Sequence, residues 1–278
     1  MRIEGKKERR IGAWGMVLMC LMGLMGMTSC EKEIDIDYRQ VDPIYVVEAS
    51  VSDSGMKARV SRTQAMDDNN STSDISGATI VVTGSDGSVT NLSYRNNGTY
   101  QSYVKGTAGV TYQIDVEVDD RHFMSTSVMQ RMPVANKFHF IWKKVMGERF
   151  LVGELLFQDI PNQDNWYFMH IYRNNIGYRW AVKRDDMNPN KELQQLFTFF
   201  RDGQHDNDVL QDGDELHIVI RAIDQRAYDY LYSMQQMSST ATNPIDNFTG
   251  GCLGYFSANS EIEYYQDFYY RDVTEDDE

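Results

Sequence analysis

The chain has 278 residues, a formal net charge of −14 at pH 7 and 12% aromatic residues. This acidity excludes nucleic acid as a partner, because binding to phosphates depends on lysine and arginine side chains that displace counterions. With only five prolines and many aromatic residues, the chain has enough apolar surface to build one large or two ordinary domains.

The first 29 residues have the layout of a secretory signal. Residues 2–10 contain five basic side chains, and residues 11–27 are uncharged and rich in Met, Leu and Gly. Because a membrane span takes roughly 20 apolar residues, we expect a cleaved signal, with a retained transmembrane anchor as the alternative. Removing residues 1–29 takes away five basic and two acidic residues and leaves a formal charge of −17.

Cys30 ends the sequence "MTSC", which resembles a bacterial lipobox. The resemblance implies that Cys30 is acylated and becomes the N-terminus of the mature protein. A single acyl chain binds a membrane only marginally, so a stable anchor needs two or three chains. Residues 30–41 form a tether in this interpretation. Its "EKEIDID" resembles the surface-export signal of Bacteroidetes lipoproteins, and a plain solvated tether is the alternative.

Residues 42–132 contain about seven short segments with the character of strands, separated by turn residues. Asp86–Gly87 and Asn97–Gly98 predict hairpin turns. Residues 109–118 alternate between apolar and polar side chains, which predicts a half-buried strand. This pattern predicts an immunoglobulin-like β-sandwich.

Residues 133–272 predict a second β-rich, sandwich-like domain. Within it, "KELQQLF" (191–197) predicts a short helix. Residues 224–237 predict one conspicuous helix, for which Asp224 is a suitable N-cap. The fold class is therefore mainly β, and residues 273–278 are expected to form a disordered tail.

Three residues of the second domain are expected in its core. With Cys20 in the signal and Cys30 acylated, Cys252 has no cysteine partner, so no intramolecular disulfide is expected. Cys252 lies in an apolar stretch, which favours a small buried hydrophobic residue over a nucleophile. For Trp166 and Trp180 we likewise expect core positions, with stacking on a sugar ligand as the alternative.

An acidic loop at residues 201–215 contains the only candidates that we find for a metal site, a non-standard calcium site. A loop of the EF-hand type that started at Asp202 would place Asn207 at the glycine position and Gly213 at the bidentate glutamate position. Because this register fails, we expect a solvated loop, and neither a metal nor a cofactor. The weak candidate ligands are Asp206, Asp208, Asp212 and Asp214.

No motif of a nucleophilic or metal-dependent enzyme occurs in the sequence. Carboxylate pairs for glycoside hydrolysis come from distant strands, so the sequence does not identify one. A cluster of aromatic residues near the end of the chain is the candidate surface for a partner or ligand. It comprises Tyr264, Tyr265, Phe268, Tyr269 and Tyr270.

Several pieces in order resemble one family. They include "YVVEASV" (45–51), "GATIVVTGSDG" (77–87), "DGDELHIVIRAIDQRAYDYLYSM" (212–234) and "GGCLGYFSA" (250–258). The chain resembles the domain-of-unknown-function family 4249, outer-membrane lipoproteins of Bacteroidetes, over nearly all of its mature length. The resemblance implies an outer-membrane address and an association with TonB-dependent transporters, and it implies no activity.

The sequence therefore predicts a non-enzymatic, lipid-anchored outer-membrane protein, exposed at the cell surface. It would assist a TonB-dependent nutrient-uptake system by binding the transporter or its cargo. One alternative is a hydrolase of surface polymers that uses carboxylates between the two domains. Another is an adhesive or fimbrial component that pairs by strand addition.

Overall fold

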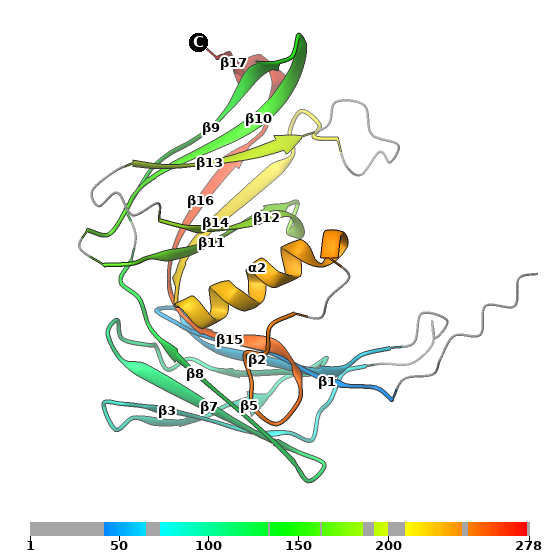
Figure 1. Ribbon diagram of the computed structural model, residues 1–278, viewed down its shortest axis with the longest axis vertical. Helices are drawn as coiled ribbons and strands as arrows, with labels where there is room; N and C mark the ends of the chain where they lie inside the picture. The colour runs from blue at the N-terminus through cyan, green and yellow to red at the C-terminus, as the bar shows by residue number, and fades with distance from the viewer. Residues whose placement is uncertain are drawn as a thin grey trace, which may run out of the picture. The chain divides into compact units, whose positions relative to one another are not determined.

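The computed structural model describes residues 42–64, 73–132, 134–161, 163–185, 192–199, 209–240 and 244–276. The described residues of Asp42–Glu278 belong to one compact unit. They form four β-sheets, which we name A to D, and one long helix (Figure 1). The fold is mainly β with one conspicuous helix, as the sequence predicts.

The first sandwich packs sheet A against sheet B. The turns expected at Asp86–Gly87 and Asn97–Gly98 are present, with Gly87, Asn97 and Gly98 at positive φ. The immunoglobulin-like topology itself stays a prediction. In spatial order, sheet A contains β15 (Leu253–Ala258), β1 (Tyr45–Ser52), β2 (Gly55–Arg62), β6 (Thr99–Ser102) and β5 (Ser93–Tyr94). Sheet B contains β4 (Val89–Asn91), β3 (Thr79–Gly84), β7 (Thr111–Val118) and β8 (Arg121–Val128).

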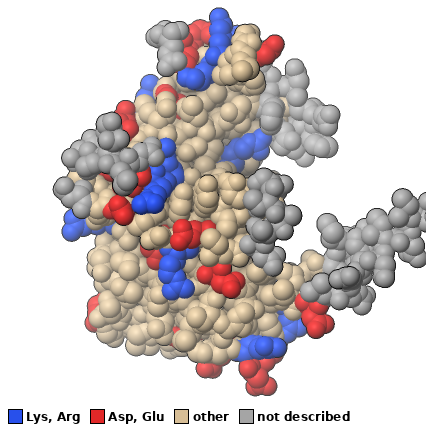
Figure 2. All heavy atoms as spheres, viewed as in Figure 1, with Lys and Arg blue, Asp and Glu red and all other residues tan. Residues whose placement is uncertain are grey.

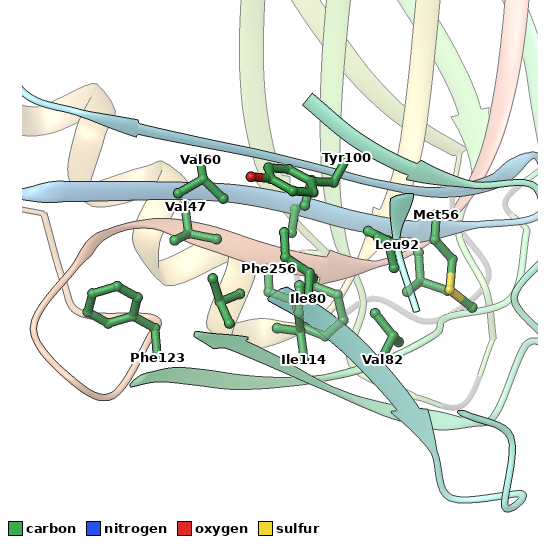
Figure 3. Close-up of a cluster of buried hydrophobic side chains, with 14 of the residues drawn as sticks. Val47, Met56, Val60, Ile80, Val82, Leu92, Tyr100, Ile114, Phe123 and Phe256 are labelled. Atoms are coloured by element: carbon green, nitrogen blue, oxygen red, sulfur yellow. The ribbon is translucent and has the colours of Figure 1, made fainter. Parts of the chain in front are cut away.

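Alternation along the strands of this sandwich creates its core. Because successive side chains of a strand point to opposite faces, every second residue of β7 is buried. Figure 3 shows Val47 and Val60 of sheet A facing Ile80 and Ile114 of sheet B, with Phe256 between them. The faces of sheets A and B that point away from this core contact solvent or other elements.

One strand of sheet A comes from the far end of the chain. β15 pairs with β1 in parallel, with Val46 opposite Leu253 and Val51 opposite Ala258. The first sandwich thus contains a segment that lies well after residue 133, where the sequence suggests the second domain begins. This return of the chain joins the two sandwiches through more than one connection.

The second sandwich packs sheet C against sheet D. Its core is rich in aromatic residues, including Phe157 and Tyr167, whose rings meet edge to face at 4.8 Å between centroids. Sheet C contains β13 (Glu192–Phe199), β10 (Glu148–Gln158), β9 (Val134–Val145) and β17 (Thr274–Glu275). Sheet D contains β12 (Ile176–Arg184), β11 (Trp166–Arg173), β14 (Glu215–Ile223) and β16 (Ser260–Asp267).

The prediction of a short helix at "KELQQLF" is wrong. In the structure Glu192–Phe199 is β13, which pairs with β10 in antiparallel register from Glu192–Gln158 to Phe199–Leu151. Leu193, Phe197 and Phe199 are buried in the core of the second sandwich. Tertiary pairing that satisfies the backbone and buries these three side chains outweighs the helix propensity of Lys, Glu, Leu and Gln.

The prediction of a disordered tail at residues 273–278 is also wrong for residues 273–276, the part that the structure describes. β17 pairs in parallel with β9, with Thr274 opposite Ile141. Asp276 accepts a hydrogen bond from Lys143 Nζ at 2.8 Å. A short 3₁₀ helix, Tyr270–Asp272, leads into β17. Backbone pairing and this ion pair together hold the tail against sheet C.

The expected helix is α2 (Gln225–Thr240). Asp224 caps it, because its Oδ1 accepts the N–H of Ala227 at 2.9 Å. Ala227, Tyr230 and Leu231 form its buried face, which packs against aromatic and aliphatic residues of sheet D and against Tyr255 of β15. In Figure 1 the helix lies between the strands of the two sandwiches.

Candidate functional site: a cleft between the sandwiches

A cleft of about 600 Å³ lies between the outer face of sheet A and the outer face of sheet D. Its lining residues come from β1, β2, β6 and β15 on one side and from β11, β12, β14 and β16 on the other. Leu231 and Met234 of α2 complete it. The volume lies within the range of about 300–1,000 Å³ that is typical of small-molecule sites.

The sheet A wall is polar because of strand alternation. Val47 and Val51 point into the first core, so Glu48 and Ser50 of the same strand face outward into the cleft. The same alternation brings outward the polar residues of the neighbouring strands. They are Lys57, Arg59, Thr99, Gln101 and Ser257.

The sheet D wall is aromatic. Tyr167, Met169 and Ile171 of β11 are buried in the second core. The alternate residues Phe168, His170 and Tyr172 therefore line the cleft, together with Trp180 of β12. His170 lies directly opposite Trp180 in the ladder. The Phe168 and Trp180 rings meet edge to face at 6.0 Å, and the His170 and Tyr172 rings stack at 4.0 Å.

Charges along the described part of the cleft are largely balanced. Arg221 Nε donates to Glu261 Oε2 at 3.0 Å, and Arg59 is bound to Asp74 at 2.9 Å. Glu48 lies opposite Arg59 in the β1–β2 ladder. Figure 2 shows charged side chains of both signs scattered among neutral residues over one face of the molecule. The cleft thus offers no concentration of one charge sign.

Burial widens the pH range over which two of the ionisable side chains in the cleft stay neutral. Desolvation, ahead of the positive charge of Arg221, lowers the pKa of His170 from 6.5 to about 4. Desolvation also raises the pKa of Tyr255 to about 12. At neutral pH the imidazole of His170 and the hydroxyl of Tyr255 are therefore uncharged groups that both donate and accept hydrogen bonds.

The two walls are held in place by buried polar contacts between the sandwiches. Asp224 Oδ2 accepts the N–H of Val128 at 3.2 Å, while its other oxygen caps α2. Ser260 Oγ donates to Gln130 O at 2.7 Å. Satisfied polar groups that are shielded from water fix a unique geometry. These contacts fix how the two sandwiches, and with them the two walls of the cleft, are placed relative to each other.

Asn259 connects β15 of sheet A to β16 of sheet D and lines the cleft. Its side chain is 2% exposed, and its Nδ2 donates to Ser257 O at 3.3 Å. Its Oδ1 finds no hydrogen-bond partner within the described part of the chain. Because buried polar atoms are normally hydrogen-bonded, this oxygen is a candidate acceptor for a group that enters the cleft.

The aromatic cluster predicted as a partner surface is mostly packed inward. Phe268 is 1% exposed in the second core, and Tyr264 and Tyr270 pack against that core. Tyr269 is half-buried at the start of the 3₁₀ helix. Only Tyr265 is a widely exposed ring among the five, at 71%.

Tyr265 is the end of a row of stacked rings that begins in the cleft. Its ring stacks on His217 at 4.3 Å, and His217 stacks on Tyr172 at 5.4 Å. The three residues lie opposite one another in the β11–β14–β16 ladder. This stack continues to His170, so the one exposed member of the predicted cluster is connected to the cleft.

The acidic residues considered for calcium have structural contacts. Asp214 accepts hydrogen bonds from Gln211 N at 2.7 Å and Asn174 Nδ2 at 2.9 Å, and it pairs with Arg173. Asp212 Oδ1 accepts the N–H of a tyrosine in the 3₁₀ helix. The described residues contain no group of three or more His, Cys, Asp or Glu side chains arranged for a metal. The other two candidates, Asp206 and Asp208, lie outside the described residues.

Cys30 also lies outside the described residues. Cys252 is buried and free, and desolvation raises its pKa to about 12, so the thiolate needed for nucleophilic chemistry is not formed at neutral pH. Within the described segments no helix has the length and apolar character required to cross a bilayer.

Sequence reasoning missed the cleft, although β11 contains a signal for it. Trp166, Phe168, His170 and Tyr172 alternate with a second set of apolar residues, so both faces of this strand are aromatic or apolar. A strand with two such faces packs on both sides. Trp180, expected in the core, is instead half-buried and lines the cleft.

One family profile matches the sequence, over residues 31–263, and it is described as Domain of unknown function (DUF4249). The chain belongs to this family. No curated protein matches it. All cleft-lining residues, from Glu48 to Glu261, fall within the part that matches DUF4249. The cleft is therefore built from the portion of the chain that defines membership in DUF4249.

Proposed function

We propose that this DUF4249 protein is a lipid-anchored binding protein of the outer membrane, which holds a small ligand in the cleft between its sandwiches. The observation that carries this proposal is a cleft of about 600 Å³ with one polar and one aromatic wall. Sites of this kind, apolar or aromatic with a few convergent polar groups, are the usual places for small ligands. The lipobox-like "MTSC" at Cys30 supports the anchor.

The binding role is non-enzymatic in this proposal. Glu261 is held by Arg221 and also accepts a hydrogen bond from Ser54 Oγ at 3.3 Å, so both of its oxygens are engaged in structural contacts. A catalytic acid or base must reach the reacting group of its substrate. These two contacts instead hold Glu261 against the wall of the cleft.

The partner in this proposal is a TonB-dependent outer-membrane transporter that receives the ligand at the cell surface. The motivation is the resemblance to Bacteroidetes outer-membrane lipoproteins. The chain's own acidity, with a formal charge of −14, disfavours direct adsorption to anionic lipid head groups, so acyl chains on Cys30 would supply the attachment.

The anchor is tested by labelling cells that express the full chain with an alkyne-bearing fatty acid. We expect label in the native protein and mass-spectrometric evidence of acylation at Cys30. Cys30→Ser should abolish the label, whereas the matched change Cys20→Ser in the signal should retain it. An unmodified Cys30 in the native membrane-bound protein would overturn the anchor.

The transporter partner is tested by extracting the full-length protein in mild detergent and identifying its co-purifying proteins. We expect a β-barrel transporter at near-stoichiometric amount. Recovery of the lipoprotein alone, with the transporter present in the same extract, would contradict this part of the proposal and leave the ligand-binding role standing.

A hydrolase is the second candidate, because Glu48 and Glu261 both line the cleft. Two carboxylates that flank a bound sugar are the requirement for glycoside hydrolysis. The test is product release from surface polysaccharides by the purified protein. Turnover that Glu48→Gln and Glu261→Gln each abolish would replace the binding role by an enzymatic one.

The adhesin alternative receives less support from the strands at the edges of the first sandwich. The edge strands β4 and β5 have three and two residues. Residues 247–249 cover β8, where the N–H of Thr249 donates to Met124 O at 2.8 Å. Strand addition needs a longer free edge.

A further inference from the structure

The two walls of the cleft differ in chemistry in a way that restricts its ligand. The sheet A wall contributes hydroxyl and amide groups, among them Ser50, Thr99, Gln101 and Ser257. The facing wall contributes aromatic rings. A ligand that satisfies both walls therefore has an apolar flat face and a margin of groups that donate and accept hydrogen bonds.

The paired charges argue against an anionic ligand. Arg221 is bound to Glu261, with 22% and 15% of the two side chains exposed, and Arg59 is bound to Asp74. An incoming phosphate or sulfate that bound either arginine would have to displace its carboxylate, so Lys57 is the cation of the lining that remains for an anion. A neutral ligand leaves both pairs in place.

A peptide that binds as an added strand is disfavoured by the position of the wall strands. β1 is hydrogen-bonded to β15 on one side and to β2 on the other, and β11 lies between β12 and β14. At their centres both walls thus present side chains and no free backbone edge, and the edge strands β12, β15 and β16 lie at the margins of the two sheets. Recognition by strand addition needs such an edge.

We infer that the cleft between the sandwiches binds a neutral oligosaccharide. This inference rests on the proposed ligand-binding function and names its ligand class. The C–H face of a sugar ring packs on Trp180 and against the edge of the Tyr172 ring, and its hydroxyl groups exchange hydrogen bonds with the sheet A wall. The uncharged imidazole of His170 and the buried Oδ1 of Asn259 are further partners for hydroxyl groups.

The cleft volume suits a ligand of more than one sugar ring. At about 600 Å³ it lies in the middle of the range for drug-sized ligands. The stack from Tyr172 through His217 to Tyr265 leads from the cleft along sheet D, and His217 and Tyr265 line a second hollow. A longer chain would extend from the cleft toward the exposed ring of Tyr265.

The test uses the full-length lipoprotein in mild detergent. The protein is first screened on an array of neutral and acidic glycans. It is then titrated calorimetrically with three separate ligands: the best glycan from the array, a tripeptide and adenosine. We expect binding of neutral glycans, weakened about tenfold by Trp180→Ala and by Tyr172→Ala, which corresponds to about 1.4 kcal/mol for each lost aromatic contact. Tyr103→Ala is the matched control, because Tyr103 is a tyrosine that is 73% exposed and is not one of the residues that line the cleft.

The outcomes separate this inference from the proposed function. One outcome is binding only of the tripeptide, adenosine or acidic glycans, with that binding lost in Trp180→Ala. This result overturns a neutral oligosaccharide as the ligand and leaves the binding role intact. Glycan binding that the cleft variants do not change overturns the assignment to this cleft. Absence of binding to every neutral glycan overturns the inference. Should Trp180→Ala fail to fold, Gln101→Ala on the opposite wall provides the same comparison.

Discussion

Arg221 and Glu261 lie directly opposite each other on β14 and β16, and Arg221 Nε donates to Glu261 Oε2 at 3.0 Å. The guanidinium also lies 5.6 Å from the centre of the Phe168 ring. The pair is thus part of the sheet D wall, where it neutralises its own charges and supports an aromatic residue of the cleft.

Removing either partner of this ion pair should destabilise the protein. Arg221→Leu leaves a carboxylate that is largely shielded from water without its partner, so we expect a loss of about 1–3 kcal/mol in the free energy of unfolding. The double variant Arg221→Leu/Glu261→Gln should lose less than the two single changes added together. Urea denaturation measures all three.

The exposed pair Arg271–Asp272 is the matched control for this prediction. Its N–O distance is 3.7 Å and its side chains are 76% and 67% exposed, so Arg271→Leu should change stability by less than about 0.5 kcal/mol. Strictly additive effects of the two changes at the cleft would show that the pair is not coupled.

His170 should make stability depend on pH in a predictable direction. Its pKa is lowered from 6.5 to about 4 in the folded protein, so the unfolded chain binds more protons between these values. Stability from this residue is therefore complete above pH 6.5 and is lost as pH falls toward 4. The effect is at most about 3 kcal/mol.

His170→Gln isolates this effect, because all other titrating groups are retained. We expect the difference in unfolding free energy between pH 7 and pH 4.5 to be smaller in the variant than in the parent protein. Chemical denaturation at the two pH values measures it. An equal difference in both proteins would show that His170 titrates normally in the folded state.

Gly254 is needed where β15 lies against β1. It has a φ of +105°, and a Cβ at this position would lie 2.0 Å from the carbonyl oxygen of Val47. We expect Gly254→Ala to lower the free energy of unfolding by about 3 kcal/mol or more, from backbone strain and the clash together.

Gly147→Ala separates the cost of backbone strain from the cost of the steric clash. Gly147 has a φ of +89° and no atom within 4 Å of the position of a Cβ, so this change should cost only about 1 kcal/mol. Thermal or urea unfolding compares the two variants. Equal losses would contradict the close contact between β15 and β1.

Cys252 should be unreactive in the folded protein. It is 3% exposed, and burial raises its pKa to about 12. In a chain that also has the changes Cys20→Ser and Cys30→Ser, iodoacetamide at pH 8 should label Cys252 slowly in the native state and rapidly in urea, with the further change Cys252→Ser as the unlabelled control. Rapid native labelling would mean that this region opens readily, because alkylation requires an accessible thiolate.

Local pattern determined much of the fold. Hairpins at Asp86–Gly87 and Asn97–Gly98, the alternating strand β7 and the helix after Asp224 follow from preferences that act over a few residues. They can therefore be predicted from the sequence, and the lipobox-like context of Cys30 can be recognised there as well. Residues 192–199 show the limit, because their helix propensity was outweighed by pairing with β10.

Only the tertiary structure decided which outer faces meet. The cleft joins Ser50 to Tyr172 and Trp180, residues more than 120 positions apart, through the pairing of β15 with β1 and the buried contacts of Asp224. Alternation specifies that a strand has two faces, but it does not specify what covers each face. That depends on non-local pairing and packing, where the free energy comes from contacts that no short segment of sequence contains.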